Sequence, residues 1–243
     1  MVEWRTLRLF CLPHAGAGAS VFARWSRALA PAIDVRALHL PGRETRLQEP
    51  PASGITPLVR ELADTIAPAL DRPFAIFGHS MGALIGFELA RELRRRGRPG
   101  PRHLLMSGLR APDRPSRLPP LSALPDPAFL DGVQDRYGRF AEEVLREPEL
   151  LDLIRPVLRA DLRMIEAYQF VEEPPLDCAL SVFGGVADHT VTPDELDGWR
   201  RHTRLSFDIE MVPGGHFFHQ ESREQLIAAV ARRLGSDRGR TGV

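Results

Sequence analysis

The sequence predicts an α/β fold built on a mostly parallel sheet. Short apolar runs alternate with longer segments of helical periodicity along most of the 243 residues, as expected for parallel strands joined by crossover helices. The alternation breaks once, between about residues 111 and 170, where strand-like runs give way to helical ones. A chain of this length can bury a sizeable core. We therefore expect one sheet with one helical insert of about sixty residues.

The first half of the chain contains four short apolar runs with helical segments between them. The expected strands are 7–12, 35–40, 74–77 and 103–108, and the expected helices are 21–29, 58–70 and 81–96. Three arginines and a glycine at 94–97 suit the end of a helix, because cations offset the helix dipole and glycine adopts the left-handed cap. These elements form repeated strand–helix units.

The second half contains the insert and then resumes the sheet pattern. A proline-rich stretch precedes two expected helices, at 129–145 and 148–170. We expect Pro156 to open a fresh helix, because proline suits a first turn better than a helix interior. Strands are expected at 179–183 and 207–212 and a last helix at 225–234. This divides the chain into an α/β core (1–111 and 171–236), a helical insert (112–170) and a disordered tail (237–243).

Composition excludes several classes of protein. Apolar residues make up 43% and charged residues 26%, and 32 basic residues balance 32 acidic ones, so the chain lacks the basic footprint of a nucleic-acid binder. Cys11 and Cys178 both lie in apolar runs, which favours a reducing compartment over a disulfide framework. Residues 1–5 are polar, and no run approaches the roughly 20 apolar residues of a membrane helix. We expect a cytoplasmic protein without membrane contact, monomeric by default.

A serine lies in a motif that is typical of activated nucleophiles. Gly78-His79-Ser80-Met81-Gly82 falls between an expected strand and an expected helix, which is the context that a nucleophile elbow requires. The turn is sharp, so glycines on both sides avoid side-chain clashes, and the helix N-terminus favours developing negative charge. We predict that Ser80 is a catalytic nucleophile.

A serine hydroxyl needs a base, and the base needs a carboxylate to orient it. In hydrolases with this elbow the chain order is serine, acid, histidine. His216 follows the last expected strand within Pro213-Gly214-Gly215-His216-Phe217-Phe218 and is the predicted base. His219 remains a competitor, three residues further round the loop.

The predicted acid is Asp188, on the loop after the strand that precedes His216. Asp194 and Asp197 fit better in the first turn of the next helix. Asp113 stays open as the alternative, because some related enzymes place the acid after the strand that follows the nucleophile.

Two backbone amides are expected to form an oxyanion hole. One is the amide of Met81, directly after the nucleophile, and the other is the amide of Ala15 in the loop 13–18. This glycine-rich loop lacks the lysine of a Walker motif and the third glycine of a dinucleotide fingerprint. We therefore interpret it as an oxyanion loop.

These motifs together resemble the type II (editing) thioesterases that accompany polyketide synthases and nonribosomal peptide synthetases, which are α/β-hydrolases. The resemblance covers nearly the whole chain and is carried by 12–16, 40–44, 77–83, 148–151, 159–161 and 213–217. One departure is visible: the family usually has Gly-Asp-x-Asp around the acid, whereas this chain has Gly185-Val186-Ala187-Asp188. We expect the loss of the first aspartate to alter loop hydrogen bonding more than the reaction.

The resemblance implies an enzyme that hydrolyses acyl groups from the phosphopantetheine arm of acyl or peptidyl carrier proteins, through an acyl-enzyme, and so clears stalled chains. It implies no metal and no cofactor of the enzyme's own. It also implies that the insert is a mobile lid over an acyl chamber, which we expect to be lined by His14, Leu124, Phe129, Tyr137 and Phe140. Two other interpretations stay open: a carboxylesterase or lipase acting on oxygen esters, and a non-catalytic acyl-binding protein.

Overall fold

A computed structural model describes residues 6–138 and 148–236 and contains a sheet of six parallel strands. The strand order is β2-β1-β3-β4-β5-β6, and all five neighbouring pairs are parallel. The strands are β1 (Leu7–Leu12), β2 (Ile33–Ala37), β3 (Phe74–His79), β4 (His103–Ser107), β5 (Ala179–Gly185) and β6 (Phe207–Val212). The predicted α/β class is confirmed, although β2 lies two to three residues before its expected place.

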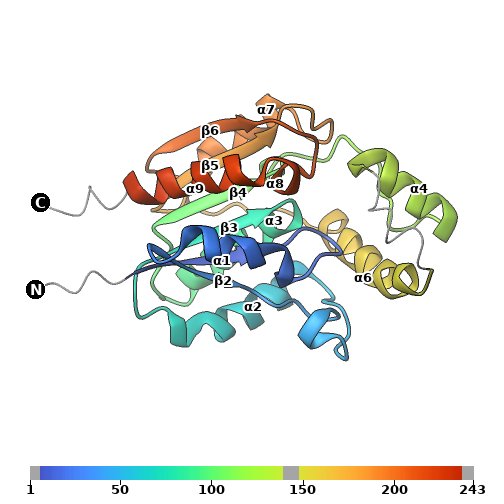
Figure 1. Ribbon diagram of the computed structural model, residues 1–243, viewed down its shortest axis with the longest axis horizontal. Coiled ribbons are helices and arrows are strands. Elements are labelled where there is room, and N and C mark those ends of the chain that lie inside the picture. The colour runs from blue at the N-terminus through green and yellow to red at the C-terminus, as the bar shows by residue number, and fades with distance from the viewer. Residues whose placement is uncertain (1–5, 139–147, 237–243) are drawn as a thin grey trace, which may run out of the picture.

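Helices cover both faces of the sheet, because alternate strand residues point to opposite sides. On one face, Phe10 and Leu12 belong to a core shared with α2 and α3; on the other, Leu9 and Cys11 pack with α1 and α9 (Figure 1). The core helices are α1 (Ala23–Leu29), α2 (Ile55–Ile66), α3 (Met81–Arg95), α7 (Pro193–Asp197), α8 (Phe218–Glu221) and α9 (Arg223–Ser236). Short 3-10 helices are η1 (Ala19–Phe22), η2 (Glu44–Arg46), η3 (Ala67–Ala69) and η4 (Gly198–His202).

The segment between β4 and β5 contains α4 (Asp126–Tyr137) and α6 (Pro148–Glu166). Figure 1 shows both helices beyond the carboxyl ends of the strands, at the end of the molecule opposite the two termini. They share a small hydrophobic cluster of Leu121, Phe129, Val133, Leu158 and Leu162. Helix α4 begins three residues before the expected start, and the later part of that expected helix lies outside the described residues.

The prediction that Pro156 opens a new helix is wrong, because α6 runs continuously through it. An interior proline removes one backbone hydrogen bond and costs about 3 kcal/mol. Apolar residues on both sides of Pro156, including Ile154, Leu158 and Leu162, pack in the same cluster with α4. Burial of this continuous apolar stripe offsets the local cost and keeps the helix in one piece.

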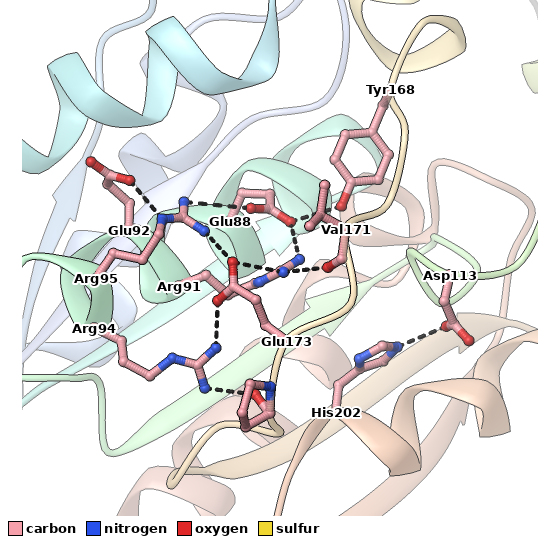
Figure 2. Close-up of polar contacts among 11 residues, drawn as sticks. Glu88, Arg91, Glu92, Arg94, Arg95, Asp113, Tyr168, Val171, Glu173 and His202 are labelled. Carbon is pink, nitrogen blue, oxygen red and sulfur yellow. Dashed lines mark hydrogen bonds and ion pairs between the residues drawn. The ribbon is translucent and has the colours of Figure 1, made fainter.

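The chain that follows α6 is fastened to α3 by a buried arginine (Figure 2). Arg91 lies 2.7 Å from Glu88 and 2.9 Å from Glu173, and it also donates to the carbonyl of Val171. Tyr168 donates to the same Glu88 carboxylate at 2.7 Å. The C-terminal end of the insert is thus tied to the helix that begins immediately after Ser80.

Candidate active site

Ser80 sits in a strained turn between β3 and α3. Its φ of 53° lies in the left-handed region, and its amide donates to the carbonyl of Ser107 at 2.7 Å. A Cβ on Gly78 would lie 2.1 Å from the carbonyl oxygen of Gly82, and a Cβ on Gly82 would lie 2.2 Å from the carbonyl oxygen of Leu12. Both flanking positions therefore require glycine, and the turn brings the start of α3 against the end of β1.

Three side chains predicted from chain order form one hydrogen-bonded chain. The hydroxyl of Ser80 lies 3.1 Å from His216 Nε2, and His216 Nδ1 lies 2.9 Å from Asp188 Oδ2. They follow β3, β6 and β5 respectively, so the carboxyl edge of the parallel sheet brings them together. All three are buried. With Nδ1 protonated, Nε2 is free to accept the serine proton, which is the geometry of a Ser-His-Asp triad.

Thr190 completes the surroundings of Asp188 and was not singled out from the sequence. Its amide and its hydroxyl donate to Asp188 Oδ1 at 2.9 and 2.7 Å, and the hydroxyl also lies 3.0 Å from His216 Nδ1. Burial acts to raise the pKa of Asp188, but the hydrogen bonds from His216 and Thr190 outweigh it and leave that pKa below its ordinary value. The spacing Asp-x-Thr, which favours a local turn around the carboxylate, is the signal that could have identified Thr190.

The alternative acid, Asp113, is engaged elsewhere. Its carboxylate lies 2.7 Å from His202 Nε2 and 2.9 Å from Arg201, and Figure 2 shows it directed at His202. Asp194 lies in the first turn of α7 as expected, whereas Asp197 is the last residue of that helix. The structure therefore pairs His216 with Asp188 among these carboxylates.

The competing base, His219, is buried and packs against the rings of other histidines. Its ring stacks on that of His79 at 3.8 Å and lies 4.8 Å from that of His14. Burial, followed by the other histidines nearby, lowers the pKa of His79 and His219 well below the ordinary value and that of His14 to about 3. Only His216 among these four rings contacts the hydroxyl of Ser80.

The two expected oxyanion donors come from the loop after β1 and from the start of α3. Met81 is the first residue of α3, where an amide has no acceptor within the helix. Ala15 lines the same cavity as Ser80. The next two amides of its loop already donate hydrogen bonds: that of Gly16 to the Asp161 carboxylate, and that of Ala17 to the His14 carbonyl. The Ala15 and Met81 amides therefore stay the predicted oxyanion donors.

The departure from the family pattern lies outside the triad. Val186, at the position of the missing aspartate, is 68% exposed, and its amide bonds to the carbonyl of Val212 at the end of β6. The main-chain path to Asp188 is therefore held by backbone bonds that do not involve the residue-186 side chain.

Two cavities meet at the nucleophile, and Ser80, Tyr137, Leu162 and His216 line both of them. The smaller, of about 170 Å³, is mainly apolar. Its other lining residues are His14, Ala15, Gly16, Ala17, Val133, Ile154, Leu158 and Phe217. The larger, of about 460 Å³, has polar groups in its wall, including Arg110, Glu166 and Thr190. The site therefore offers an apolar branch and a polar branch that both reach Ser80.

Two of the five residues expected in an acyl chamber line these cavities, namely His14 and Tyr137. Leu124 and Phe129 do not: they pack inside the insert, and the guanidinium of Arg159 covers the ring of Phe129 at 3.9 Å. Phe140 lies outside the described residues.

Leu158 and Leu162 of α6 line the apolar cavity instead. Their four-residue spacing on α6 was visible in the sequence, but it does not show which neighbour the apolar stripe faces.

Neither a metal centre nor a membrane span emerges from the described ranges. No group of three or more histidine, cysteine or acidic side chains in residues 6–138 and 148–236 is arranged to hold a metal ion. No helix within the same ranges is both long enough and apolar enough to cross a membrane.

A nucleophile elbow at the carboxyl edge of a parallel sheet, with a serine, a histidine and an aspartate in hydrogen-bond contact, defines a serine hydrolase of the α/β-hydrolase fold. Residues 7–234 match the thioesterase domain family. The chain belongs to that family.

Several proteins match this chain along nearly its whole length. The gramicidin S biosynthesis protein GrsT of Aneurinibacillus migulanus is 40% identical over 228 residues, which cover 94% of this chain and 89% of that protein. A protein named linear gramicidin dehydrogenase LgrE, from Brevibacillus parabrevis, is 41% identical over 94% of this chain and 88% of its own. The solved structure of the type II thioesterase BorB from the borrelidin biosynthetic cluster superposes with a TM-score of 0.86 at 34% identity, over 96% of this chain and 94% of that one.

Proposed function

We propose that this protein is a type II thioesterase that releases acyl groups from the phosphopantetheine arm of acyl or peptidyl carrier proteins. In that role it clears aberrant or stalled chains during polyketide or nonribosomal peptide synthesis. The observation that carries the proposal is the Ser80–His216–Asp188 chain at the junction of an apolar and a polar cavity. Full-length similarity to enzymes of such biosynthetic clusters supports it.

The proposed reaction has two halves. Ser80 Oγ attacks the thioester carbon while its proton passes to His216 Nε2, and Asp188 stabilises the imidazolium that forms. The Ala15 and Met81 amides hold the oxyanion, and each such donor typically contributes about 3–4 kcal/mol to lowering the barrier. Collapse of the tetrahedral intermediate breaks the carbon–sulfur bond, and the pantetheine sulfur leaves as the thiol with the proton from His216. Water activated by His216 then releases the free acid and restores Ser80, so side chains and water suffice without a cofactor.

The two cavities fit the two ends of such a substrate. The apolar branch suits the acyl group, and its volume of about 170 Å³ lies below the roughly 300–1,000 Å³ of ordinary ligand pockets. A short acyl chain is therefore the expected occupant. The larger branch, whose wall includes Arg110 and Glu166, suits the amide-rich pantetheine arm.

The test compares acyl-loaded carrier protein with the matching p-nitrophenyl ester. We expect a higher kcat/KM on the carrier-bound thioester, and we expect Ser80→Ala to abolish turnover of both while its unfolding midpoint is unchanged. A strong preference for the oxygen ester would instead identify a carboxylesterase. Failure of a fluorophosphonate probe to label Ser80 would point to a non-catalytic acyl-binding protein.

The name of LgrE raises a redox alternative, which a simple control addresses. The loop containing Gly16 and Gly18 lacks the third glycine of a dinucleotide fingerprint, so we expect no substrate-dependent oxidation of NADPH or NADH. Consumption of either nucleotide with an acyl or aldehyde substrate would overturn the hydrolase assignment.

The proposal also includes a reducing, cytoplasmic location and a monomeric state. Cys11 and Cys178 are free and buried, and burial raises the pKa of the Cys178 thiol to about 12. Such thiols do not require an oxidising compartment. Sedimentation at micromolar concentration is expected to give a single species of 27.1 kDa.

A further inference from the structure

Two sequence motifs that the mechanism does not use meet in the interior of the protein. Arg43, on the loop after β2, and Asp161, on α6, form a two-point ion pair with nitrogen–oxygen distances of 2.6 and 2.8 Å. The exposed fractions of their side chains are 8% and 2%. The two residues are 118 positions apart, so this contact joins the helical insert directly to the core.

Both partners also hold the backbone of the oxyanion loop. Asp161 Oδ2 accepts the Gly16 amide at 2.8 Å, and Arg43 Nη1 donates to the Ala17 carbonyl at 3.1 Å. The Gly16 amide belongs to the peptide unit that follows Ala15, and Gly16 has a left-handed φ of 77°. This unit and the unit that carries the Ala15 amide share the Cα of Ala15, so only two backbone torsions separate the held amide from the proposed oxyanion donor.

The rest of the loop has a separate anchor. Glu44 accepts the amides of Ala19 and Ser20 at 2.8 and 3.1 Å, at the start of η1. The Arg43–Asp161 pair therefore holds the backbone next to the Ala15 amide, while Glu44 holds the segment that follows.

We propose that Arg43 and Asp161 are positioning residues of the oxyanion hole. Because Asp161 is part of α6, the Ala15 amide is aimed at the oxyanion only while this helix of the insert is seated on the core. The inference rests on the proposed oxyanion role of Ala15. Displacement of α6 would remove the acceptor of the Gly16 amide and leave the Arg43 charge without its partner.

Two variants separate this role from simple folding. Asp161→Asn keeps an oxygen in place but leaves Arg43 buried without its counter-charge, which destabilises folded proteins. The double variant Arg43→Met with Asp161→Leu replaces the pair by apolar groups of similar size, a change that commonly preserves folding. The matched control is Asp126→Asn, which breaks a 2.6 Å ion pair between α4 and Arg159 of α6 without touching the oxyanion loop.

The rate measurements use the acetyl thioester of N-acetylcysteamine and p-nitrophenyl acetate, which need the same oxyanion hole. We expect kcat of both Arg43/Asp161 variants to fall about 10- to 100-fold on both substrates, as for a catalytic group displaced by about 1 Å, with KM changed less than about threefold. The control is expected to stay within about threefold of the parent protein.

A transition-state readout distinguishes positioning from general damage. An alkyl boronic acid accepts the Ser80 oxygen at boron, and one boron-bound oxygen then occupies the oxyanion position. Its affinity should fall by the same factor as kcat/KM. The proposal would be overturned if the double variant folds and keeps the kcat of the parent protein. It would also be overturned if its kcat falls while its boronate affinity stays that of the parent protein. If the proposed thioesterase function is wrong, the parent protein itself will hydrolyse the thioester weakly. The ratio of variant to parent kcat on p-nitrophenyl acetate still tests the role of the ion pair in that case.

Discussion

Replacing Asp188 with asparagine is expected to reverse the proton arrangement on His216. The Thr190 amide donates to Asp188 Oδ1 at 2.9 Å, so an asparagine at this position must keep its carbonyl oxygen there. Its NH₂ group then takes the place of Oδ2, 2.9 Å from His216 Nδ1. Two donors cannot face each other, so Nδ1 loses its proton and Nε2 carries it, directed at Ser80.

The magnitude follows from that wrong tautomer. His216 Nε2, 3.1 Å from the serine hydroxyl, could no longer accept the serine proton. The same change in another Ser-His-Asp enzyme lowers kcat about 10⁴-fold with the geometry intact, which corresponds to about 5.4 kcal/mol at 1.36 kcal/mol per tenfold. We expect a loss of that size at neutral pH.

The assay is steady-state hydrolysis of a short acyl thioester, with released thiol measured colorimetrically and folding checked by the urea unfolding midpoint. Asp113→Asn is the matched comparison, because Asp113 contacts His202 and Arg201 instead of His216. It should lower stability and leave kcat within about tenfold. The reasoning is refuted if folded Asp188→Asn loses less than tenfold in kcat, or if Asp113→Asn loses as much as Asp188→Asn.

Three further outcomes are expected. His79 and His219 have folded-state pKa values well below the ordinary one, so below about pH 6.5 the unfolded chain binds more protons than the folded one. The free energy of unfolding therefore falls as the pH drops through that value, by up to about 2.7 kcal/mol per pH unit for two protons. Urea unfolding at pH 7.5 and 5.5 measures this fall, and a flat profile would contradict it. Gly82→Ala places a Cβ 2.2 Å from a β1 carbonyl oxygen, so it should lower the free energy of unfolding by about 1–3 kcal/mol and abolish activity. Gly100→Ala, which has open space around it, should change neither the free energy of unfolding nor the activity. Ile154→Phe, in the wall of the apolar cavity, should reduce kcat/KM for a hexanoyl thioester at least about tenfold more than for an acetyl thioester; equal losses would argue against acyl binding there.

Local and chain-order information predicted most of the fold and the reacting groups. Alternation of apolar strands with helical segments is a local property, and it identified all six strands to within a few residues. Gly78 avoids a clash with Gly82 of the same turn and Gly82 avoids one with Leu12 of β1, and both glycines belong to the local elbow pattern. In a parallel sheet all strands end at one edge, so candidates that follow successive strands, such as Asp188 and His216, could be expected to meet.

The tertiary structure decided what depends on contacts between distant residues. The order of motifs along the chain left both Asp188 and Asp113 open as the acid of the triad. The hydrogen bond of Asp188 to His216 and that of Asp113 to His202 distinguish them. Helical periodicity showed that α4 and α6 have apolar stripes but not that Phe129 faces the interior of the insert while Leu158 faces the chamber. Such contacts depend on how the insert sits on the core, and no local pattern encodes that placement.

The residues 43 and 161 illustrate the difference best. Each stood in a motif that suggested a relationship to known enzymes, yet their charges differ in no visible way from those of the many exposed arginines and aspartates. Their role emerges only when the fold buries both and places them on the Gly16 amide and the Ala17 carbonyl. The sequence by itself determined the sheet, the elbow and the order of the triad, whereas the fold decided which distant charges hold the oxyanion loop, because burial and pairing arise only when the chain is packed.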